Sequence, residues 1–527
     1  MNSLIGTGAL IRLALRRERV LTPLWIALLA VMAVGQVKRY GQTFPTPRAI
    51  ADFAAEMSGN RALIAFGGEI YSPTIGGMTV WKIADIVYTL IALMAVLTVV
   101  RHTRAEEESG RAELVGSAVV GRAAALTASL VVSCAASLVT GLVIALGMMG
   151  AGLEAAGSLA LGIGVAAPGL IFAGVAAVAA QLTEGARTAI ALASGVLAAS
   201  YVLRFVADGS GQEWVKWLSP QGWSHLLRPY GEERWTPLGL ILPAVLLTVA
   251  AAYRLAARRD LGTGLISQRP GPATAAPGLR GPLALAWRLQ RGPLLGWTAG
   301  FAVMGVFFGG LAATIPDMAG QGASIQEFFR RYTGPEGASL TDAYLWLIAL
   351  SMGYTAALYP LLAVLRLRGE EITGHAELLL TAPVSRLRLA ASHLVFAALG
   401  TVAVMAAGGL TMGLIAGDPL RVLGATLLQV PAVWAVGGAG VLAFGLLPRA
   451  AAAISWAAFL FVNLFGEVLG PILGMDYWIA NTAVPFHHLP KILSGGAFTA
   501  VPPAALTGIA VLLCGAGLLA YRRRDTA

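Results

Sequence analysis

The sequence predicts an all-α polytopic membrane protein with twelve transmembrane helices, arranged as two parallel six-helix repeats. Three observations support this fold class. The chain is 57% hydrophobic and only 12% charged, with a mean hydropathy of +0.74, which is unlike soluble domains. Its apolar residues gather in long runs with few or no charges, and one charged stretch is spelled twice. Composition and run length predict the spans, and the repetition predicts the two halves.

Apolar runs near 18 residues or longer predict the spans, because roughly 20 helical residues cross the hydrocarbon core. The fifth run is the shortest. The predicted spans are residues 20–36, 81–100, 123–152, 155–181, 188–201, 237–253, 294–315, 343–365, 389–416, 422–447, 450–465 and 501–520.

The distribution of Lys and Arg predicts that both termini are cytoplasmic, because cytoplasmic loops retain positive charge. With alternate loops assigned to alternate sides, about two thirds of the 37 Lys and Arg residues fall on the side of the N-terminus. The net charge of +10 therefore reflects topology and attraction to anionic lipid headgroups. A nucleic-acid partner is not needed to explain it.

Residues 4–19 predict a helix that lies in the cytoplasmic membrane interface, because they combine Leu and Ile with four arginines. The alternative is that these arginines only set the topology of the first span. No convincing small-residue cleavage site follows, so no signal peptide is expected. Cys134 and Cys514 lie in apolar runs, which indicates neither a disulfide nor a metal site.

The twice-spelled stretch marks an internal repeat. Residues 104–122 (RAEEESGRAELVGSAVVGR) match residues 368–386 (RGEEITGHAELLLTAPVSR) at 10 of 19 positions without a gap. The Arg-Arg-Asp triplet at 258–260 recurs at 523–525. Six spans per copy is an even number, so the two copies have the same orientation. We expect a first half at 1–260, a cytoplasmic linker with a second interfacial helix at 261–292, and a second half at 293–527.

Each charged stretch follows the second span of its half, so it is predicted to be cytoplasmic. We expect one helix at 104–120 and another at 368–384, with Glu106, Gly110 and Glu113 on one face of the first. Two equivalent surfaces on one side suit a pair of identical soluble subunits. The alternative is a solvated loop whose charges keep it out of the lipid. A solvated loop explains the polarity but not the repetition, so the docking interpretation is favoured.

Residues 213–235 and 476–491 separate the fifth and sixth spans of the two halves on the outer side. Both segments are dense in Trp, Tyr, His and Pro. Because amphipathic rings settle at the membrane surface, we expect short helices in the outer interface.

These features together resemble an ABC-2 type, ABCG-like permease: six spans per half, an interfacial N-terminal helix and E-E-x-x-G-x-A-E-L after span two. The fused double-length form resembles actinobacterial exporters of polyketide antibiotics of the tetronasin-transport type. The resemblance covers essentially the whole chain. It implies a plasma-membrane permease of a bacterial ABC exporter for hydrophobic or amphipathic compounds, whose coupling helices contact ATPase subunits. The coupling residues that we assign on this basis are Arg104, Glu106, Glu107, Gly110, Glu113, Arg122, Arg368, Glu370, Glu371, Gly374, Glu377 and Arg386.

The second copy departs from the first at several positions. Ile372, His375 and Pro383 stand where the first copy has Glu108, Arg111 and Val119. Functional equivalence of the two surfaces therefore stays open.

The chain is not expected to hydrolyse ATP. A P-loop needs G-x-x-x-x-G-K-[ST], and residues 116–123 (GSAVVGRA) offer Arg122 for the Lys and Ala123 for the hydroxyl. No polar segment is long enough for a nucleotide-binding domain. We expect no cofactor on this chain, with ATP and Mg²⁺ bound by two copies of a single separate ATPase polypeptide.

The main alternative is a proton-coupled secondary multidrug transporter, because twelve spans in two parallel halves also describe the major facilitator class. Such carriers need ionisable groups near the bilayer centre. The helical rise places Asp85, Arg204 and Glu467 about 24–27 Å from the cytoplasmic edge, at the outer interface. Lys82, three residues from Asp85, favours a simple surface pair. With no charged residue at the midplane of a predicted span, proton coupling is disfavoured.

A membrane enzyme, such as a lipid-linked sugar transferase, is the second alternative. It needs paired carboxylates or a metal cluster near the interface. Glu232-Glu233 and His487-His488 are the clearest outer candidates. Neighbouring side chains need not converge, so a solvated loop is the favoured interpretation of both pairs.

A pathway without fixed charge suits hydrophobic or amphipathic substrates. In permeases of the resembled class the second and fifth spans of each half line the central cavity. This implies a pathway that includes Tyr88, Met94, Tyr201, Tyr354, Phe459, Asn463 and Phe465, and ordinary helix packing is the alternative for each.

Overall fold

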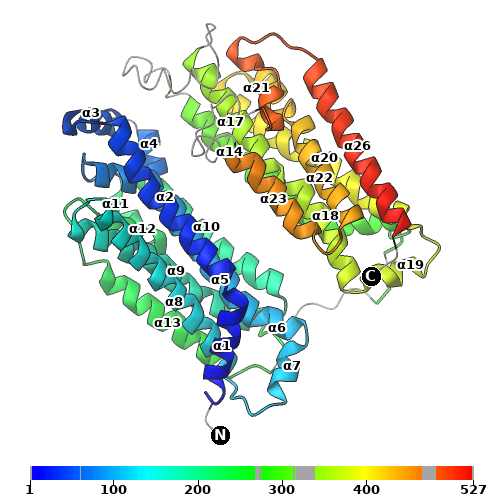
Figure 1. Cartoon of the computed structure of the whole chain (residues 1–527), viewed down its shortest axis with the longest axis horizontal. Coiled ribbons are helices and arrows are strands. Elements are labelled where there is room, and N and C mark those ends of the chain that lie inside the picture. The colour runs from blue at the N-terminus through cyan, green and yellow to red at the C-terminus, as the bar shows by residue number, and fades with distance from the viewer. Residues whose placement is uncertain are drawn as a thin grey trace. The chain divides into compact units, whose positions relative to one another are not determined.

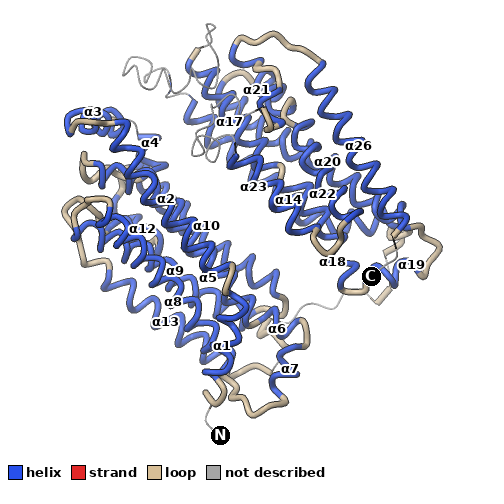
Figure 2. The backbone as a smooth tube through the Cα atoms, viewed as in Figure 1, coloured by secondary structure: helices blue, strands red, loops and turns tan. Residues whose placement is uncertain are grey.

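The computed structural model describes residues 3–59, 61–260, 262–266, 273–274, 276–312, 315, 339–465 and 482–524. Within these ranges the regular structure is entirely helical (Figure 2). The chain divides into two compact units, Met1–Gly271 and Pro272–Ala527. We describe each unit, called the first and the second half below, by itself.

The first half begins with a short helix followed by a bundle of long ones (Figure 1). The short helices α3 and α4 were not predicted from the sequence, whereas α11 and α12 lie in the segment 213–235 where short helices were expected. The helices are α1 (Thr7–Glu18), α2 (Leu21–Thr43), α3 (Pro47–Ser58), α4 (Arg61–Gly67), α5 (Ile75–His102), α6 (Arg104–Glu108), α7 (Arg111–Gly116), α8 (Ala124–Gly150), α9 (Ala155–Leu182), α10 (Ala186–Ser210), α11 (Glu213–Lys216), α12 (Pro220–Leu226) and α13 (Leu238–Ala256).

The second half also consists of long helices with short ones at their ends (Figure 1). Its described elements are α14 (Pro282–Ala312), α17 (Leu340–Ala356), α18 (Leu358–Ile372), α19 (His375–Leu380), α20 (Arg386–Ala416), α21 (Pro419–Leu427), α22 (Val430–Leu446), α23 (Ala451–Leu464), the 3₁₀ turns η2 (Pro485–His488) and η3 (Ile492–Ser494), and α26 (Val501–Arg523).

In the described part of the chain, 11 helices are long and apolar enough to cross a membrane. The remaining predicted span, 450–465, is the eleventh in chain order and corresponds to the shorter apolar helix α23, which has 14 residues. The fifth predicted span is longer than expected, because α10 runs for 25 residues. The turns that α10 adds at its C-terminal end contain Arg204 and Asp208. These charged residues lie beyond the apolar run from which the span was predicted, and they form ion pairs inside the fold.

The interfacial helix before the first span differs between the halves. In the first half α1 ends at Glu18 and a separate helix, α2, starts at Leu21. In the second half α14 is one 31-residue helix with Pro293 in its interior. The second interfacial helix predicted within 261–292 is therefore not a separate element, since residues from Pro282 onward continue into the span.

Close approach of glycines sets the packing of several long helices. A Cβ built on Gly141 in α8 lies 2.3 Å from the carbonyl oxygen of Gly162 in α9, and the reverse distance is 2.6 Å. In the second half a Cβ on Gly445 in α22 lies 2.1 Å from the carbonyl oxygen of Gly517 in α26. Small residues at such crossings allow backbones to approach, which strengthens van der Waals packing between membrane helices.

The second and fourth spans form the centre of each half. The shares of the best apolar window that are buried are 72% for α5 and 78% for α9, against 11–50% for the other spans of the first half. In the second half the segments Leu340–Ile372 and Pro419–Leu446 are both 67% buried. The acidic stretch of each half thus follows the second span, which is one of the two most enclosed, at the end predicted to be cytoplasmic.

Candidate functional site

The two acidic segments, residues 104–120 and 368–384, are each interrupted by a glycine. Gly110 has φ +72° and Gly374 has φ +74°, values that favour glycine because a Cβ is strained there. A left-handed glycine ends a helix, so α6 stops before Gly110 and α18 stops before Gly374. The expectation of one continuous helix in each segment is therefore wrong, and each segment is a helix, a turn and a second short helix.

In the first acidic segment Glu107 points into the protein. Two nitrogens of Arg259 donate to its carboxylate, at 2.5 and 2.8 Å. Arg104 donates to the same carboxylate at 2.8 Å and to the carbonyl oxygen of Ala180 at 3.0 Å. The side chains of Glu107 and Arg259 are only 10% and 9% exposed. Glu107 is thus a partner of this chain's own arginines.

The neighbouring glutamates of the first segment are also paired. Glu106 forms ion pairs with Arg17 of α1 at 2.9 Å and with Arg111 of α7 at 3.1 Å. Glu108 accepts a hydrogen bond from the backbone N–H of Ala186, the first residue of α10, at 3.0 Å. A carboxylate at a helix N-terminus satisfies a free N–H group and complements the helix dipole.

The same arrangement recurs in the second half. Arg524 donates to the carboxylate of Glu371 at 2.5 Å, and Arg386 donates to the carbonyl oxygen of Arg524. Arg122 donates to the carbonyl oxygen of Arg259 in the same way. The offsets agree, since Glu107 and Glu371 are 371 − 107 = 264 residues apart and the two arginines 524 − 259 = 265.

The two arginines that open the acidic segments have matching roles. Arg368 donates to the carbonyl oxygen of Pro448 at 2.7 Å, just after α22, as Arg104 donates to Ala180 near the end of α9. Glu370 differs from Glu106, because it contacts His375 at 3.3 Å and Arg366 at 4.0 Å. The two sites are therefore similar in plan and different in detail.

A second set of residues in the acidic segments faces outward. Glu113 and Glu377 are exposed, and the leucines that follow them, Leu114 and Leu378, are 74% and 71% exposed. Exposed leucines at equivalent positions of both copies are unusual for a polar surface loop. The motif A-E-L thus supplies a repeated surface of one carboxylate and one apolar side chain.

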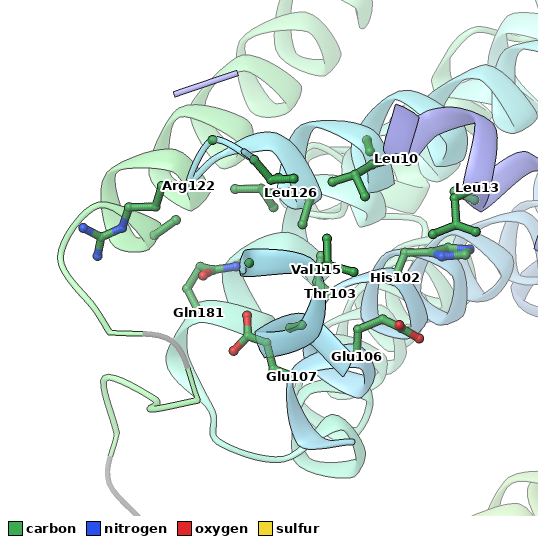
Figure 3. A pocket seen from close by; sticks show the side chains of 18 of the residues that line it. Leu10, Leu13, His102, Thr103, Glu106, Glu107, Val115, Arg122, Leu126 and Gln181 are labelled. Carbon is green, nitrogen blue, oxygen red and sulfur yellow. The ribbon is translucent and has the colours of Figure 1, made fainter. Parts of the chain in front are cut away.

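A cavity of about 460 Å³ lies behind the first acidic segment (Figure 3). Leu10 of α1 and Leu126 of α8 lie on one side of it, and Glu106 and Glu107 lie opposite (Figure 3). Val115 of α7 also lines it. The second short helix of the segment is therefore backed by space rather than by packed side chains.

Glu18, at the C-terminal end of α1, connects this helix to the end of α5. Its carboxylate lies 2.9 Å from Nε2 of His102 and 2.9 Å from Nη1 of Arg101. Burial by itself raises the pKa of Glu18, but the hydrogen bond from His102 and the charge of Arg101 outweigh it and hold that pKa below its ordinary value of 4.5. The pair joins the predicted interfacial helix to the second span.

Asp85 does not form the expected surface pair with Lys82. It is 8% exposed, and its two oxygens lie 2.9 Å from Nη2 of Arg204 and 2.9 Å from Nε2 of His225. Arg204 also pairs with Asp208 at 3.1 Å. The helical rise per residue predicted how far along its span Asp85 lies. It could not predict Arg204 and His225 as partners, because they are more than 100 residues away in the chain.

The outer ionic network extends beyond Asp85. Lys216 of α11 lies 2.5 Å from Asp208 and 3.2 Å from Glu69. Lys216 and Asp208 are almost fully buried. The position in the second half that corresponds to Asp85 is 85 + 264 = 349, which is Ala349. The network is thus a feature of the first half. Glu467, the third charged residue placed at the outer interface, lies outside the described residues.

The predicted pathway residues lie in the core and in aromatic contacts of the two halves. Tyr88 and Met94 are in the core of the first half, at 0% and 1% exposure. The guanidinium carbon of Arg204 lies over the ring of Tyr201, 5.0 Å from the ring centroid. The ring of Tyr354 lies tilted against that of Phe486, with centroids 4.6 Å apart, and the ring of Phe465 stacks on that of Phe461. Phe459 and Asn463 are half-buried on α23. Their role in a pathway stays a prediction.

The histidines of the membrane-enzyme alternative contact neighbouring groups of the second half. His488 is hydrogen-bonded to the carbonyl oxygen of Thr482 at 2.8 Å, and the ring of His487 lies 6.5 Å from that of Tyr354. Among the described residues, no group of three or more His, Cys, Asp or Glu side chains forms a site for a metal ion.

Arg259 and Arg524 are the functional candidates that sequence reasoning did not select. Both belong to the Arg-Arg-Asp triplets at 258–260 and 523–525 that indicated the repeat. Two repeated signals, the E-E pair and this triplet, occur at nearly the same offset. The repetition of both signals could have nominated the triplet, but the contact between them is visible only in the structure.

Comparison with known proteins supports the internal duplication. The model of the family described as "Multidrug efflux system permease Rv1217c, C-terminal domain" matches the chain twice, at residues 9–255 and at residues 279–522. The chain is 41% identical over 531 residues to the multidrug efflux system permease protein Rv1217c of Mycobacterium tuberculosis (strain ATCC 25618 / H37Rv). That similarity covers 99% of this chain and 95% of the mycobacterial protein.

Proposed function

The chain belongs to the Rv1217c family of multidrug efflux system permeases, and from this premise we propose that it is the permease of an ATP-driven exporter. It is a multi-pass membrane protein and the membrane component of an efflux system. The energy source, the partner and the substrate pathway are parts of our proposal. A separate soluble ATPase binds ATP and Mg²⁺ and supplies the energy of ATP hydrolysis, and two copies of it bind one permease chain.

The single observation that carries this proposal is the repeated exposed pair, Glu113-Leu114 and Glu377-Leu378. Glu107 and Glu371 of the same motif are internally neutralised by arginines. The A-E-L end of the motif therefore presents to solvent one carboxylate and one leucine per half, in equivalent places. Two identical subunits recognise two equivalent surfaces, as symmetric assemblies generally do.

The exposed pair also indicates what the partner surface contains. Full burial of a leucine side chain contributes about 1.5–3 kcal/mol, so Leu114 and Leu378 are the expected anchors. A cation beside the apolar pocket complements Glu113 and Glu377. Ile372 is 67% exposed where the first copy has Glu108, so the second surface is the more apolar of the two.

In this proposal the acidic segments, both termini and the linker lie in the cytoplasm, and the chain lies in the bacterial plasma membrane. ATP binding draws the two ATPase copies together and moves the acidic segments. The two six-span halves then alternate between inward-open and outward-open states. Substrates are hydrophobic or amphipathic compounds, with polyketide antibiotics as the specific class that the sequence resemblance suggests. The predicted pathway residues contact them between the spans.

The test is a pair of variants in the co-expressed system. Leu114→Asp with Leu378→Asp, and Glu113→Arg with Glu377→Arg, are expected to lose capture of the ATPase and vanadate-sensitive transport into inverted vesicles. Ile266→Asp is the matched control, because Ile266 is 62% exposed near the end of the first half but is not part of the repeated motif. Membrane insertion should be equal in all variants.

A proton-driven carrier gives a different result in the same vesicles. If the purified chain alone moved its substrate down a pH gradient without nucleotide, ATP coupling would be refuted. Full ATPase capture by both double variants would instead refute the docking surface.

A further inference from the structure

Two buried ion pairs connect the acidic segments to the distant end of their own half. Glu107 pairs with Arg259, which follows α13, and Glu371 pairs with Arg524, which follows α26. The partners are separated by 152 and 153 residues in the chain. We call these two pairs the Glu–Arg clamps. Each joins the segment after the second span to the end of the last helix of the same half.

Each clamp arginine is also fixed to the fourth span of its half. Nε of Arg259 donates to the side-chain oxygen of Gln181 in α9 at 2.6 Å. Nη1 of Arg524 donates to the carbonyl oxygen of Phe444 in α22 at 3.0 Å, and its guanidinium lies 4.6 Å from the Phe444 ring centroid. Both arginines therefore hold the acidic segment against two long helices at once.

The clamps are rigid connections for physical reasons. The four side chains are 9–16% exposed, so water screens the pairs weakly. In the first half the contact is bidentate, which fixes orientation as well as distance. Loss of one partner leaves a buried charge unpaired, which is costlier than loss of an exposed pair.

In the first half, the part of the acidic segment after Gly110 has no comparable attachment among the described residues. Helix α7 follows the left-handed Gly110 and borders the 460 Å³ cavity. A displacement of α7 alone is absorbed by that space. A displacement of α6 must move Glu107, and with it Arg259 and the ends of α9 and α13.

On this basis we propose that the Glu–Arg clamps transmit displacement of the acidic segments to the fourth and sixth spans. This inference rests on the proposed docking of an ATPase, but it assigns a different step. Glu113 and Leu114 bind the partner, whereas Glu107, Arg259, Glu371 and Arg524 are positioning residues. Loss of a clamp uncouples ATP hydrolysis from transport without releasing the ATPase.

The experiment measures transported substrate per ATP hydrolysed in vesicles that contain the permease and its co-expressed ATPase. Glu107→Gln and Arg524→Gln are each expected to lower this ratio at least tenfold while capture of the ATPase is unchanged. Arg17→Gln is the matched control, because the Arg17–Glu106 pair is at the same end and Arg17 is 40% exposed. Its ratio is expected to stay within twofold of the unmodified protein.

A charge swap keeps the test decisive if a single variant folds poorly. The swap is made in the second half, where Arg524 is the one arginine paired with Glu371 among the described residues. In the first half Glu107 pairs with Arg104 as well as with Arg259, so a swap there would disturb two contacts. Glu371→Arg with Arg524→Glu is expected to recover the ratio to within threefold, above either single change. A purely structural role instead changes the amount of folded protein and leaves the ratio per folded complex unaltered.

The possible results separate the two proposals. If the unmodified chain captures no ATPase, the proposed function fails. If it captures the ATPase and transport requires ATP, but Glu107→Gln and Arg524→Gln keep the normal ratio, only the transmission role of the clamps is refuted. Loss of ATPase capture by the clamp variants also overturns it, because these residues then belong to docking.

Discussion

Replacement of Arg204 by methionine tests the outer ionic network of the first half. Arg204 is fully buried and lies 2.9 Å from Asp85 and 3.1 Å from Asp208. Arg204→Met keeps most of the side-chain volume but leaves both carboxylates without this cation. Breaking a buried pair typically costs about 3–5 kcal/mol.

The expected cost lies at the lower end of that range. Asp85 keeps His225 at 2.9 Å, and Asp208 keeps Lys216 at 2.5 Å. We therefore expect a loss of about 3 kcal/mol, which is a change of roughly 150-fold in the equilibrium between folded and unfolded protein. The exposed pair Arg228–Glu213 supplies the control, because Glu213 is 45% exposed and such pairs contribute about 0–1 kcal/mol.

The assay is reversible unfolding of the purified chain in mixed micelles, followed by fluorescence of its 12 tryptophans. Arg204→Met should shift the midpoint far more than Glu213→Gln. Asp85→Asn added to Arg204→Met should recover part of the loss, because it removes one of the two carboxylates that have lost the arginine. Equal midpoints for Arg204→Met and Glu213→Gln would refute the view that the network stabilises the first half.

Three further predictions concern helix packing, the glycine turns and pH. Gly141→Ala should destabilise the first half by about 1–3 kcal/mol, because the added Cβ meets the Gly162 carbonyl, whereas Gly150→Ala, with open space around its Cβ, should be neutral in the same unfolding assay. Gly110→Ala should cost about 1–2 kcal/mol of stability through the positive φ alone, and it should weaken capture of the ATPase. Gly116→Ala, whose added Cβ also meets nothing, should leave both stability and capture unchanged. Equal capture by both variants would contradict the role of the turn. Glu18 has a lowered pKa in the folded protein, so its stabilisation is present above the unfolded value near 4.5 and is lost as pH falls through the folded pKa. Glu18→Gln should therefore lower the unfolding midpoint at pH 7, and its effect should shrink as pH falls from 4.5 through the folded pKa. A pH-independent difference would show that the carboxylate charge is not involved.

Hydropathy predicted the helical class well, because a bilayer requires each span to satisfy its own backbone hydrogen bonds within a long apolar run. The comparison with Rv1217c confirms the prediction of a multidrug efflux permease. Run length underestimated α10, whose last turns contain charged residues, and it located α23 close to the predicted bounds 450–465.

The acidic segments show a different limit. Periodicity placed Glu106, Gly110 and Glu113 on one face of a helix. In the structure Gly110 itself is in the left-handed region and separates Glu106 from Glu113. The repeated spelling identified the segments, yet it did not distinguish Glu107, which pairs inside, from Glu113, which is exposed. That distinction depends on an arginine 152 residues away, and such long-range contacts are not encoded in local spacing.

The outer network also constrains how the first half is assembled during synthesis. Asp85 leaves the ribosome 204 − 85 = 119 residues before Arg204, so α5 enters the membrane carrying a carboxylate whose cation does not yet exist. Until α10 arrives, this carboxylate lacks its arginine and the end of α5 is not yet held by the network, and cells triage such incompletely folded states with chaperones and proteases. A chain that stops between α9 and α10 should therefore be degraded rapidly, and the lifetime of nascent fragments should rise once the arginine is inserted.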